Sequence, residues 1–378
     1  MSAPRFHQML VSPRIGGGEK LALEIHRYLD SRWPGSSRLL TPAHGDTERL
    51  ASAEHLDFRT YRLDWLRNKG RLFHLLGNVS VGARLLRAAG LLHIHSPFVY
   101  GALRPVLRST GLKIVVHLHL DYSREELDWC LRHPPDLVIV CAAFMKELVT
   151  DILARRGAPQ VPVVPVINAV DVSKYKPGDA DSARRLMGVA ADETVLLMTA
   201  NLAAHKGQET ALHTVQLLRQ RKVNAQLWLV GEERAPDGNY LRRLRELAGA
   251  LRLDDAVRFL GFRNDIPALL HAADFLLLPS KQEGLPLSIL EAQASKVIVL
   301  AAPTAGIPEV IEHGRTGFLI PADDAEGYAR VVEQLLNDPQ AKTQIAAAAY
   351  EQVMSNFTLT RYCDNVLAAY GKVMSVAR

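Results

Sequence analysis

Two glutamates, Glu283 and Glu291, flank a segment that joins an apolar run, Phe275–Pro279, to a predicted helix. The apolar run is typical of a buried parallel strand, and ligands of open α/β sheets bind beyond the carboxyl ends of such strands. Gly284 lets the backbone approach a ligand, and Pro286 near the first helical position opens a helix whose positive end suits a phosphate. The pattern predicts that the two carboxylates accept hydroxyl groups on either side of a bound phosphate, as a nucleotide-sugar would require.

On its own, the spacing of these glutamates is more typical of a helix with an acidic first turn and a solvated glutamate. The neighbouring motifs favour a ligand site. The segment resembles the signature of the retaining glycosyltransferases of family 4 (glycosyl transferases group 1), in which two glutamates separated by seven residues bracket the donor. Residues Ala292–Val299, Gly306–Val310 and Gly314–Leu319 continue the family pattern in the same order, although Lys296 stands where the family usually has glycine.

The order of predicted elements indicates an α/β chain. Its 378 residues are too many for one comfortable core, so two domains are expected. The resemblance implies the GT-B architecture, in which two Rossmann-like doubly wound domains face a cleft. We expect an N-terminal acceptor-side domain at residues 1–168, to which a C-terminal helix at 361–378 crosses back, and a nucleotide-sugar donor-binding domain at 169–360. The loop Lys174–Asp181 is the predicted linker, with Pro177 and Gly178 inside it.

Strands and helices alternate in both halves. Strands are predicted at Gln8–Ser12, Arg38–Thr41, Leu91–His95, Lys113–His119, Asp136–Val140, Val161–Val166, Thr194–Met198, Gln226–Gly231 and Val257–Leu260. Helices are predicted after the glycines at 16–18, at Lys69–Ala89, near Tyr100–Ser109, at Ala142–Ala154 and at Arg361–Val376.

A lysine followed by glycine, Lys206-Gly207, comes after the strand predicted at Thr194–Met198. A lysine at that place can neutralise a diphosphate, whereas the alternative is an ordinary surface lysine. The family pattern is Arg, four residues, Lys, Gly; here Lys206 matches and Asn201 replaces the arginine. The resemblance therefore implies that Lys206 carries the charge of the leaving diphosphate, with the helix end or Arg14 as the second positive group.

The resemblance also assigns the donor contacts around the two glutamates. Glu283 positions the sugar hydroxyls, and Glu291 accepts from the ribose. Backbone N–H groups of Leu285 and Leu287, next to Gly284, hold the phosphate.

Two glycine-containing loops complete the implied donor site. Gly231 and the turn that contains Arg263 and Ile266 are expected against the nucleobase, through backbone groups and an apolar side chain. Gly16 and Gly17, before the first predicted helix, are candidate contacts to the donor or acceptor; a plain tight turn is the alternative.

Four histidines end two predicted strands. Alternation along a strand places His117 and His119 on one face, so both are expected to reach the cleft. His119 aligns with the family histidine that lies beside the transferred sugar. His93 and His95 repeat the arrangement one strand earlier and, with His117, are weaker candidates for acceptor contacts. For any single one of them, a satisfied core histidine is the competing interpretation.

No metal or cofactor motif is evident. Asp179 and Asp181 form the only Asp-x-Asp, and they lie in the predicted linker without a preceding apolar strand, so they are interpreted as solvated. We expect no cofactor and no metal, with a UDP- or GDP-sugar as donor substrate. Cys130, Cys141 and Cys363 are far apart and are interpreted as ordinary buried thiols in a reducing compartment.

Positive charge is concentrated in the segment Arg59–Lys113, which contains ten basic residues and one acidic residue, although the whole chain carries only +5. Apolar residues including Trp65, Leu66 and Phe73 are interleaved with these charges. The segment is predicted to lie on an anionic membrane surface; a solvated basic face and an anionic soluble acceptor are the alternatives. Without a membrane span or a signal peptide, the expected location is the cytoplasm, including the inner face of its membrane.

The function predicted is that of a retaining, metal-independent glycosyltransferase of the hexosyltransferase class, acting on a glycan or lipid-linked acceptor in cell-envelope polysaccharide, lipopolysaccharide or glycolipid synthesis. No carboxylate nucleophile is evident at the sugar face, so front-side attack is the route that the resemblance implies. A nucleic acid partner is not expected. The alternative is a non-catalytic, nucleotide-sugar-binding partner subunit, suggested by Asn201 and Lys296.

Overall fold

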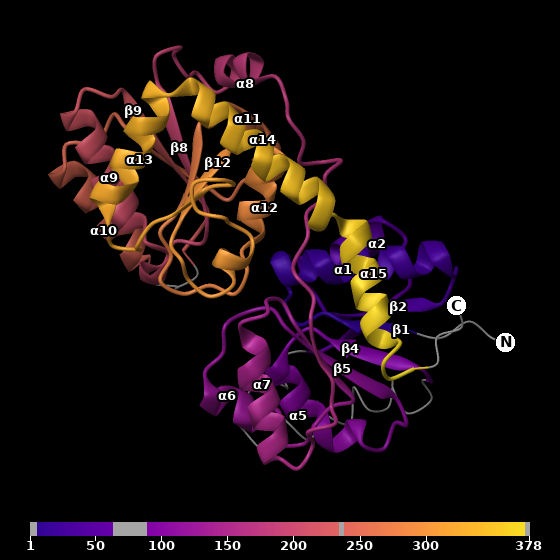
Figure 1. Cartoon of the computed structure of the whole chain (residues 1–378). Helices are drawn as coiled ribbons and strands as arrows, with labels where there is room; N and C mark the ends of the chain where they lie inside the picture. The colour runs from indigo at the N-terminus through magenta and orange to yellow at the C-terminus, as the bar shows by residue number, and fades with distance from the viewer. Residues whose placement is uncertain (1–5, 63–88, 234–237, 375–378) are drawn as a thin grey trace. The chain divides into compact units, whose positions relative to one another are not determined.

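The computed structural model describes residues 6–62, 89–233 and 238–374, which form two compact units (Figure 1). The first unit comprises Met1–Asn168 together with Leu359–Arg378, and the second comprises Ala169–Thr358. Each unit has its own parallel sheet covered by helices, so the predicted fold class, α/β with two Rossmann-like doubly wound domains, is confirmed.

Within its described residues, the first unit contains a seven-stranded sheet in the order β3-β2-β1-β4-β5-β6-β7, and every pair of neighbouring strands is parallel. The strands are β1 (Phe6–Met9), β2 (Ser37–Pro42), β3 (Phe58–Tyr61), β4 (Leu91–Ile94), β5 (Lys113–Leu118), β6 (Leu137–Val140) and β7 (Val163–Pro165). Both faces of β4 and β6 are buried, which explains their continuous apolar sequences.

Helices α1 (Gly17–Arg32) and α15 (Leu359–Tyr370) pack against each other and against this sheet, although they lie near opposite ends of the chain (Figure 1). The other described helices of the unit are α2 (Asp46–Ala53), α5 (Pro97–Leu107), α6 (Arg124–Cys130) and α7 (Met145–Arg155). The C-terminal segment therefore completes the core of the first unit.

The second unit has a six-stranded parallel sheet in the order β10-β9-β8-β11-β12-β13, counted over its described residues. The strands are β8 (Thr194–Thr199), β9 (Ala225–Val230), β10 (Val257–Gly261), β11 (Phe275–Leu278), β12 (Ile298–Ala301) and β13 (Phe318–Leu319). The helices are α8 (Ala180–Leu186), α9 (Gln208–Gln220), α10 (Asn239–Ala250), α11 (Ile266–Ala272), α12 (Leu287–Ala294), α13 (Ala325–Asn337) and α14 (Pro339–Asn356), with short 3-10 turns η1 (Ala204–Lys206) and η2 (Ile307–Glu309).

The strand order reverses once in each sheet. In the second unit the chain runs outward from β8 to β10 and then returns to the other side of β8 as β11, so β8 and β11 border the switch point. In the first unit β1 and β4 border the switch point. Ligands of doubly wound sheets bind beyond the carboxyl ends of the strands at such points. The loops after β8 and β11, and those after β1 and β4, are therefore the first places to look for a site.

Several predicted boundaries differ from the structure. Gly17 is already the first residue of α1, because Glu19 caps this helix end, so the glycine loop is shorter than expected. The predicted linker, Lys174–Asp181, lies inside the second unit, where Tyr175 is buried and the His271 ring bonds to the Lys176 carbonyl oxygen at 2.8 Å. The predicted helix Lys69–Ala89 falls almost entirely outside the described residues.

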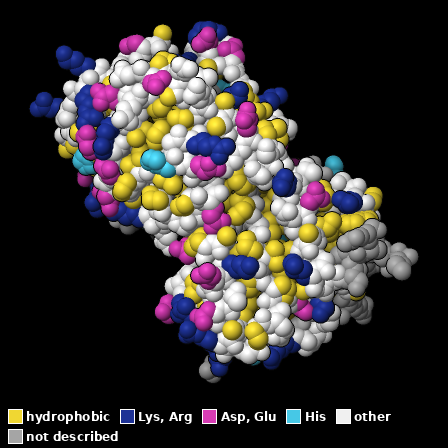
Figure 2. All heavy atoms as spheres, in the orientation of Figure 1, with side chains coloured by type: hydrophobic (Ala, Val, Ile, Leu, Met, Phe, Trp, Pro, Cys, Tyr) yellow, Lys and Arg dark blue, Asp and Glu magenta, His cyan; other side chains and the backbone are white. Residues whose placement is uncertain are grey.

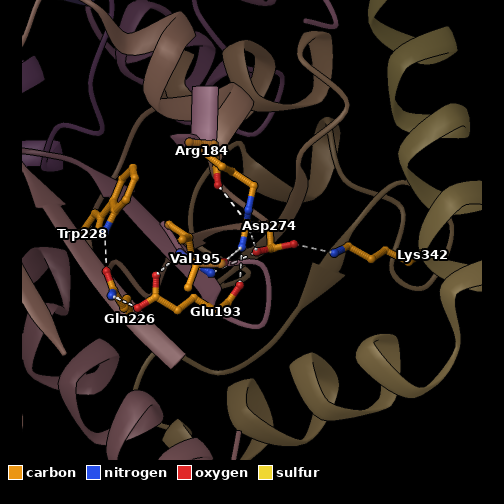
Figure 3. Close-up of polar contacts among 9 residues, drawn as sticks. Arg184, Glu193, Val195, Gln226, Trp228, Asp274 and Lys342 are labelled. Carbon is orange, nitrogen blue, oxygen red and sulfur yellow. Dashed lines mark hydrogen bonds and ion pairs between the residues drawn. The ribbon is translucent and has the colours of Figure 1, made fainter. Parts of the chain in front are cut away.

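A cluster of ion pairs lies at the beginning of β8 and β11, at the end of the second sheet opposite the loops that follow these strands (Figure 3). Asp274 accepts hydrogen bonds from Arg184 at 3.1 Å, from Lys342 at 2.8 Å and from the Val195 N–H at 3.0 Å. This single carboxylate therefore ties α8, α14 and the beginning of β8 to the beginning of β11.

We expect Asp274→Asn to lower the free energy of unfolding of the second unit by about 2 kcal/mol, because two partly buried cations lose their counter-ion. Hydrogen exchange in β8 and β11 measures this loss. The control is Asp255→Asn, since Asp255 pairs with Arg219 at an exposed position and should change stability by less than about 0.5 kcal/mol. Equal protection in the two variants would show that the cluster contributes nothing to stability.

Candidate functional site

The loops after β8 and β11 meet at the switch point of the second unit. Gly207 has a φ of 76°, and a Cβ atom there would lie 2.0 Å from the Pro279 carbonyl oxygen, so only glycine permits this approach. The Lys281 N–H donates to the His205 carbonyl oxygen at 2.7 Å. The two loops are thereby held together by backbone contacts.

This junction places Lys206 beside Glu283. The Lys206 Nζ lies 2.8 Å from Glu283 Oε1, and the two side chains are only 17% and 8% exposed. A buried pair of this kind fixes the position of a positive charge in a partly desolvated place, where it acts strongly on a nearby anion. Burial, followed by the Lys206 charge, lowers the pKa of the adjacent His205. The structure thus brings together the predicted diphosphate lysine and the predicted sugar-binding glutamate.

Helix α12 begins at Leu287, directly after Pro286, and carries the second predicted glutamate, Glu291, as its fifth residue. Glu291 is buried and is hydrogen-bonded to the Tyr175 side chain. Burial, and then the Glu291 carboxylate, raise the pKa of Tyr175. Tyr175 was not predicted as a site residue; the only signal was an aromatic residue in an otherwise polar predicted linker. It therefore helps to orient the Glu291 carboxylate.

The later motifs of the second unit support the glutamate segment. The Gly306 N–H donates to the Gly284 carbonyl oxygen at 3.0 Å, and the Thr304 hydroxyl donates to the Ser280 carbonyl oxygen at 2.9 Å. The fully buried Gln293 amide donates to the Thr316 carbonyl oxygen at 3.0 Å. These bonds hold the loop containing Leu285, which is itself buried, against the end of β11.

Lys296 follows α12 in the left-handed region, with a φ of 60°. Glycine adopts this conformation without strain, which gives a physical reason for the glycine that the family usually has there. The Lys296 ammonium lies 5.2 Å from the centre of the Tyr350 ring, a cation–π contact that partly offsets the strain.

Loops after β9 and β10 extend the same edge of the sheet. A Cβ atom on Gly231 would lie 2.0 Å from the Ala200 carbonyl oxygen, and the Gly231 N–H donates to the Gly261 carbonyl oxygen at 2.8 Å. Asn201 accepts from the Gln208 side chain through its backbone oxygen at 2.9 Å. These loops therefore follow the carboxyl edge from β10 to β11.

In the turn predicted to contact the nucleobase, the arginine pairs with a neighbouring aspartate. Arg263 makes a two-point contact with Asp265, including an Nε to Oδ1 bond of 2.7 Å, and Ile266 begins α11. The Arg263 charge is therefore neutralised within its own turn, which is consistent with recognition through backbone and apolar groups rather than through this guanidinium.

In the first unit, the loop after β1 leads into α1. The Gly16 N–H donates to the Glu19 carboxylate at 3.1 Å, so the helix supplies its own anion there. Gly18 faces a predicted site residue: a Cβ atom there would lie 3.2 Å from ring atoms of His119. The glycines therefore allow the beginning of α1 to pack against the imidazole of His119.

The four predicted histidines form one cluster. Ring centres lie 4.1 Å apart for His93 and His95, and 4.0 Å apart for His117 and His119. His95 Nδ1 lies 2.9 Å from His119 Nε2. His93, His95 and His117 are buried, whereas His119 is partly exposed. Alternation correctly placed these rings on shared faces, but only His119 has the exposure that a ligand contact needs.

All four imidazoles favour the neutral form. Burial lowers the pKa of His119 to about 4. Burial, with smaller contributions from neighbouring rings of the cluster, lowers the pKa values of His93, His95 and His117 well below the ordinary 6.5. Each ring therefore has one N–H donor and one bare nitrogen near neutral pH.

Other predicted features have ordinary structural roles. Asp179 caps α8 by accepting from the Ser182 N–H at 3.1 Å, as expected for a solvated Asp-x-Asp. The three cysteines are buried and none of them forms a disulfide in the part of the chain that the structure describes. Throughout residues 6–62, 89–233 and 238–374, no helix is long and apolar enough to cross a membrane.

The basic segment is described only in part. Arg67, Lys69, Arg71, Arg84 and Arg87 lie outside the described residues, as do Trp65, Leu66 and Phe73. Of the described members, Lys113 pairs with Asp136 at 2.9 Å and Arg104 lies over the Trp129 ring. On the face drawn in Figure 2, basic and acidic side chains are interspersed.

Residues 180–352 match the family model described as Glycosyl transferases group 1. The chain is 31% identical over 216 residues to N-acetyl-alpha-D-glucosaminyl L-malate synthase of Bacillus anthracis, covering 57% of this chain and 55% of that protein. It is 29% identical over 242 residues to D-inositol 3-phosphate glycosyltransferase of Stackebrandtia nassauensis, covering 62% and 54%. The chain spans about half the length of these curated relatives.

Solved structures share the fold across the whole chain. Anabaena Alr3699/HepE in complex with UDP and glucose superposes with a TM-score of 0.83 at 21% identity, covering 97% of this chain and 99% of that one. Sucrose-phosphate synthase of Thermosynechococcus elongatus superposes with a TM-score of 0.78 at 18% identity, covering 99% and 100%. The predicted resemblance to the glycosyl transferases group 1 is confirmed over residues 180–352, and the GT-B fold class is confirmed.

Proposed function

We propose, from the group 1 match of its second unit, that this chain is a retaining glycosyltransferase that moves a sugar from a nucleoside diphosphate to an acceptor. The observation that carries the proposal is the Lys206–Glu283 pair at the switch point between β8 and β11. A fixed cation, a hydroxyl-accepting carboxylate and a helix beginning stand together there, and a second buried carboxylate, Glu291, follows on the same helix.

The proposed chemistry is cleavage of the sugar–phosphate bond with positive charge developing on the sugar and negative charge on the departing diphosphate. Lys206 and the N–H groups at the beginning of α12, including that of Leu287, stabilise the diphosphate without a metal ion. Glu283 both orients Lys206 and accepts from sugar hydroxyls. In the first unit, the partly exposed ring of His119 lies beside the substrate, as the family resemblance implies. The acceptor attacks from the side that the diphosphate leaves, with retention of configuration.

The proposed donor is a UDP- or GDP-sugar, supported by the similar fold of Alr3699/HepE, whose structures contain UDP, UDP with glucose and UDP-glucose. A thermal-shift screen of nucleotide-sugars tests this directly. A rise in melting temperature with one donor, together with sugar transfer or slow hydrolysis, would support an enzyme. Tight donor binding without turnover would instead support a non-catalytic partner subunit.

For the acceptor, we propose a glycan or lipid-linked molecule of the cell envelope, reached from the cytoplasm through the basic segment Arg59–Lys113. The names of two relatives mention small anionic molecules, malate and inositol 3-phosphate. These names favour a soluble anionic acceptor as the second candidate. Sedimentation with vesicles containing anionic lipid, at low and high salt, separates the two. Binding that falls with salt and with Arg67→Glu/Lys69→Glu/Arg71→Glu supports the membrane; failure to bind at any salt concentration removes it.

Glu291→Ala should weaken donor binding by about 1–3 kcal/mol, because the hydroxyl groups that it accepts from, and the Tyr175 hydroxyl, lose their partner in a buried place. Calorimetry with the donor and with the free nucleoside diphosphate measures the change. The matched control is Glu312→Ala, since Glu312 pairs with Arg315 on the surface. Unchanged affinity in Glu291→Ala would remove this residue from the donor site.

A further inference from the structure

A continuous chain of hydrogen bonds runs through the histidine cluster to the C-terminal helix. His119 Nε2 faces His95 Nδ1 at 2.9 Å, and His95 Nε2 faces Gln8 Oε1 at 3.1 Å. The Gln8 amide nitrogen donates to the Tyr370 hydroxyl at 3.0 Å, and that hydroxyl lies 2.7 Å from His93 Nδ1. The chain joins β1, β4, α15 and the end of β5. Apart from His119, all its members are buried.

The Gln8 amide determines the direction of the chain, because its oxygen only accepts and its nitrogen only donates. His95 must therefore carry its proton on Nε2, which leaves His95 Nδ1 bare. A bare Nδ1 requires His119 to donate from Nε2, so the bare nitrogen of His119 is Nδ1. At the other end, the Tyr370 oxygen already accepts from Gln8, and its own proton goes to His93 Nδ1.

Packing against two neighbours also restricts rotation of the His119 ring. The His117 ring stacks on it with centres 4.0 Å apart and planes inclined by 24°. Gly18 approaches from α1, closely enough that a Cβ atom there would lie 3.2 Å from the ring. The His119 Nδ1 atom is buried and has no hydrogen-bond partner among the described residues. The lone pair of this nitrogen therefore has a fixed direction but no donor among the described residues.

The nitrogens of His93, His95 and His117 lie within 4.8 Å of one another, a distance that also invites comparison with a metal site. Two observations favour hydrogen bonding instead. Both ring nitrogens of His95 already have partners, at 2.9 and 3.1 Å. The His93 and His117 rings are stacked with planes inclined by only 7°, whereas ligands of one ion direct their nitrogens toward a common point.

We propose that Gln8 and Tyr370 are positioning residues that hold His119 in a single tautomer, protonated on Nε2, and thereby fix the orientation of its partly exposed ring in the site. The role of His119 toward a substrate rests on the proposed function; its tautomer does not. The C-terminal helix thus contributes to the site through Tyr370, although the Gln8 amide and the His95 ring lie between Tyr370 and His119.

Long-range proton–nitrogen NMR of the whole chain, labelled with 15N only at histidine, reads the tautomers directly at pH 7.5. We expect His119, His95 and His93 each to show two widely separated ring nitrogen signals, with the proton on Nε2. In Gln8→Met, which removes both the acceptor and the donor, the His95 and His119 signals should move together as tautomers exchange. A proton on Nδ1 of His119 in the unaltered chain, or unchanged signals in Gln8→Met, would overturn the proposal.

Tyr370→Phe tests the far end of the chain, and Tyr362→Phe is its matched control. Tyr362 lies on the same helix, is equally buried, and its hydroxyl has no partner among the described residues. Tyr370→Phe should shift the nitrogen signals of His93 and broaden those of His95 and His119, while Tyr362→Phe leaves them in place. Equal signals in both variants would show that the Tyr370 hydroxyl positions nothing.

The functional readout is the separation of kcat from KM. We expect Tyr370→Phe to lower kcat about tenfold with the donor KM unchanged, and Tyr362→Phe to change neither. A loss in both variants, or a rise in donor KM alone, would indicate general damage and overturn the positioning role. Absence of turnover with every nucleotide-sugar counts against the proposed function, whereas the NMR signals decide the tautomer in either case.

Discussion

Lys206→Met should reduce sugar transfer by about 100- to 1,000-fold, because negative charge grows on the diphosphate as the bond breaks and a fixed cation stabilises that charge. Binding of the free nucleoside should change little, since Lys206 contacts the diphosphate and not the base in the proposed site. Lys206→Arg keeps the charge and should retain much more activity than Lys206→Met. The side chain of Glu283 would lose its 2.8 Å partner only in the methionine variant.

Turnover and nucleoside affinity, measured on the same preparations, check this expectation. The matched control is Lys281→Met in the same loop region, where the lysine pairs with Asp323 at 2.7 Å on the surface and should be dispensable. Thermal unfolding of both variants shows whether the isolated Glu283 carboxylate has damaged the fold. Equal turnover of Lys206→Met and Lys281→Met would mean that Lys206 is an ordinary structural lysine.

The sequence predicted the second unit well because its motifs are local. The predicted site residues there lie in the loops that follow strands or in the first turns of the next helix, so strand order brings Lys206 and Glu283 to one edge. The close approach of Gly207 to Pro279 could not be predicted, because it depends on a left-handed backbone angle and on the relative heights of two loops. The Tyr175 contact to Glu291 was also missed, since it joins residues more than 100 positions apart.

In the first unit, the alternation along a strand predicts which side chains share a face but not whether that face is buried. Alternation places His93 and His95, and likewise His117 and His119, on common faces, and the structure agrees. Burial is decided by what covers that face. The covering residue, Tyr370, comes from a helix at the other end of the chain, and nothing in the strand sequences indicates its arrival.

Acidification should destabilise the first unit selectively. Burial keeps His93, His95, His117 and His119 neutral in the fold, with pKa values lowered to about 4 for His119 and well below 6.5 for the others, whereas in the unfolded chain each titrates near 6.5. Below pH 6.5 the unfolded chain binds more protons than the fold does. Stability is therefore complete above pH 6.5 and falls with decreasing pH, until His119 protonates in the fold near 4 and the other three rings at their own lowered pKa values.

The expected size of this loss is large because four groups act together. Each contributes about 1.4 kcal/mol per pH unit below 6.5, so the sum is on the order of 5 kcal/mol at pH 5.5. Hydrogen exchange at pH 7.5 and 5.5, corrected for the intrinsic rate, should show lost protection in β4 and β5. Strands β8 and β11 contain no histidine and serve as the internal control.

His117→Leu sharpens the test, because the ring of His117 is fully buried and neither nitrogen has a partner among the described residues. Leucine fills a similar volume and cannot be protonated. The variant should keep its stability at pH 7.5 and lose less of it at pH 5.5, since one of the four titrating rings of the cluster is gone. If protection in β4 and β5 were the same at both pH values, the histidines would have to accept protons in the fold as readily as in the unfolded chain. Nothing in the cluster favours such protonation, because burial and the neighbouring rings lower these pKa values and no carboxylate raises them.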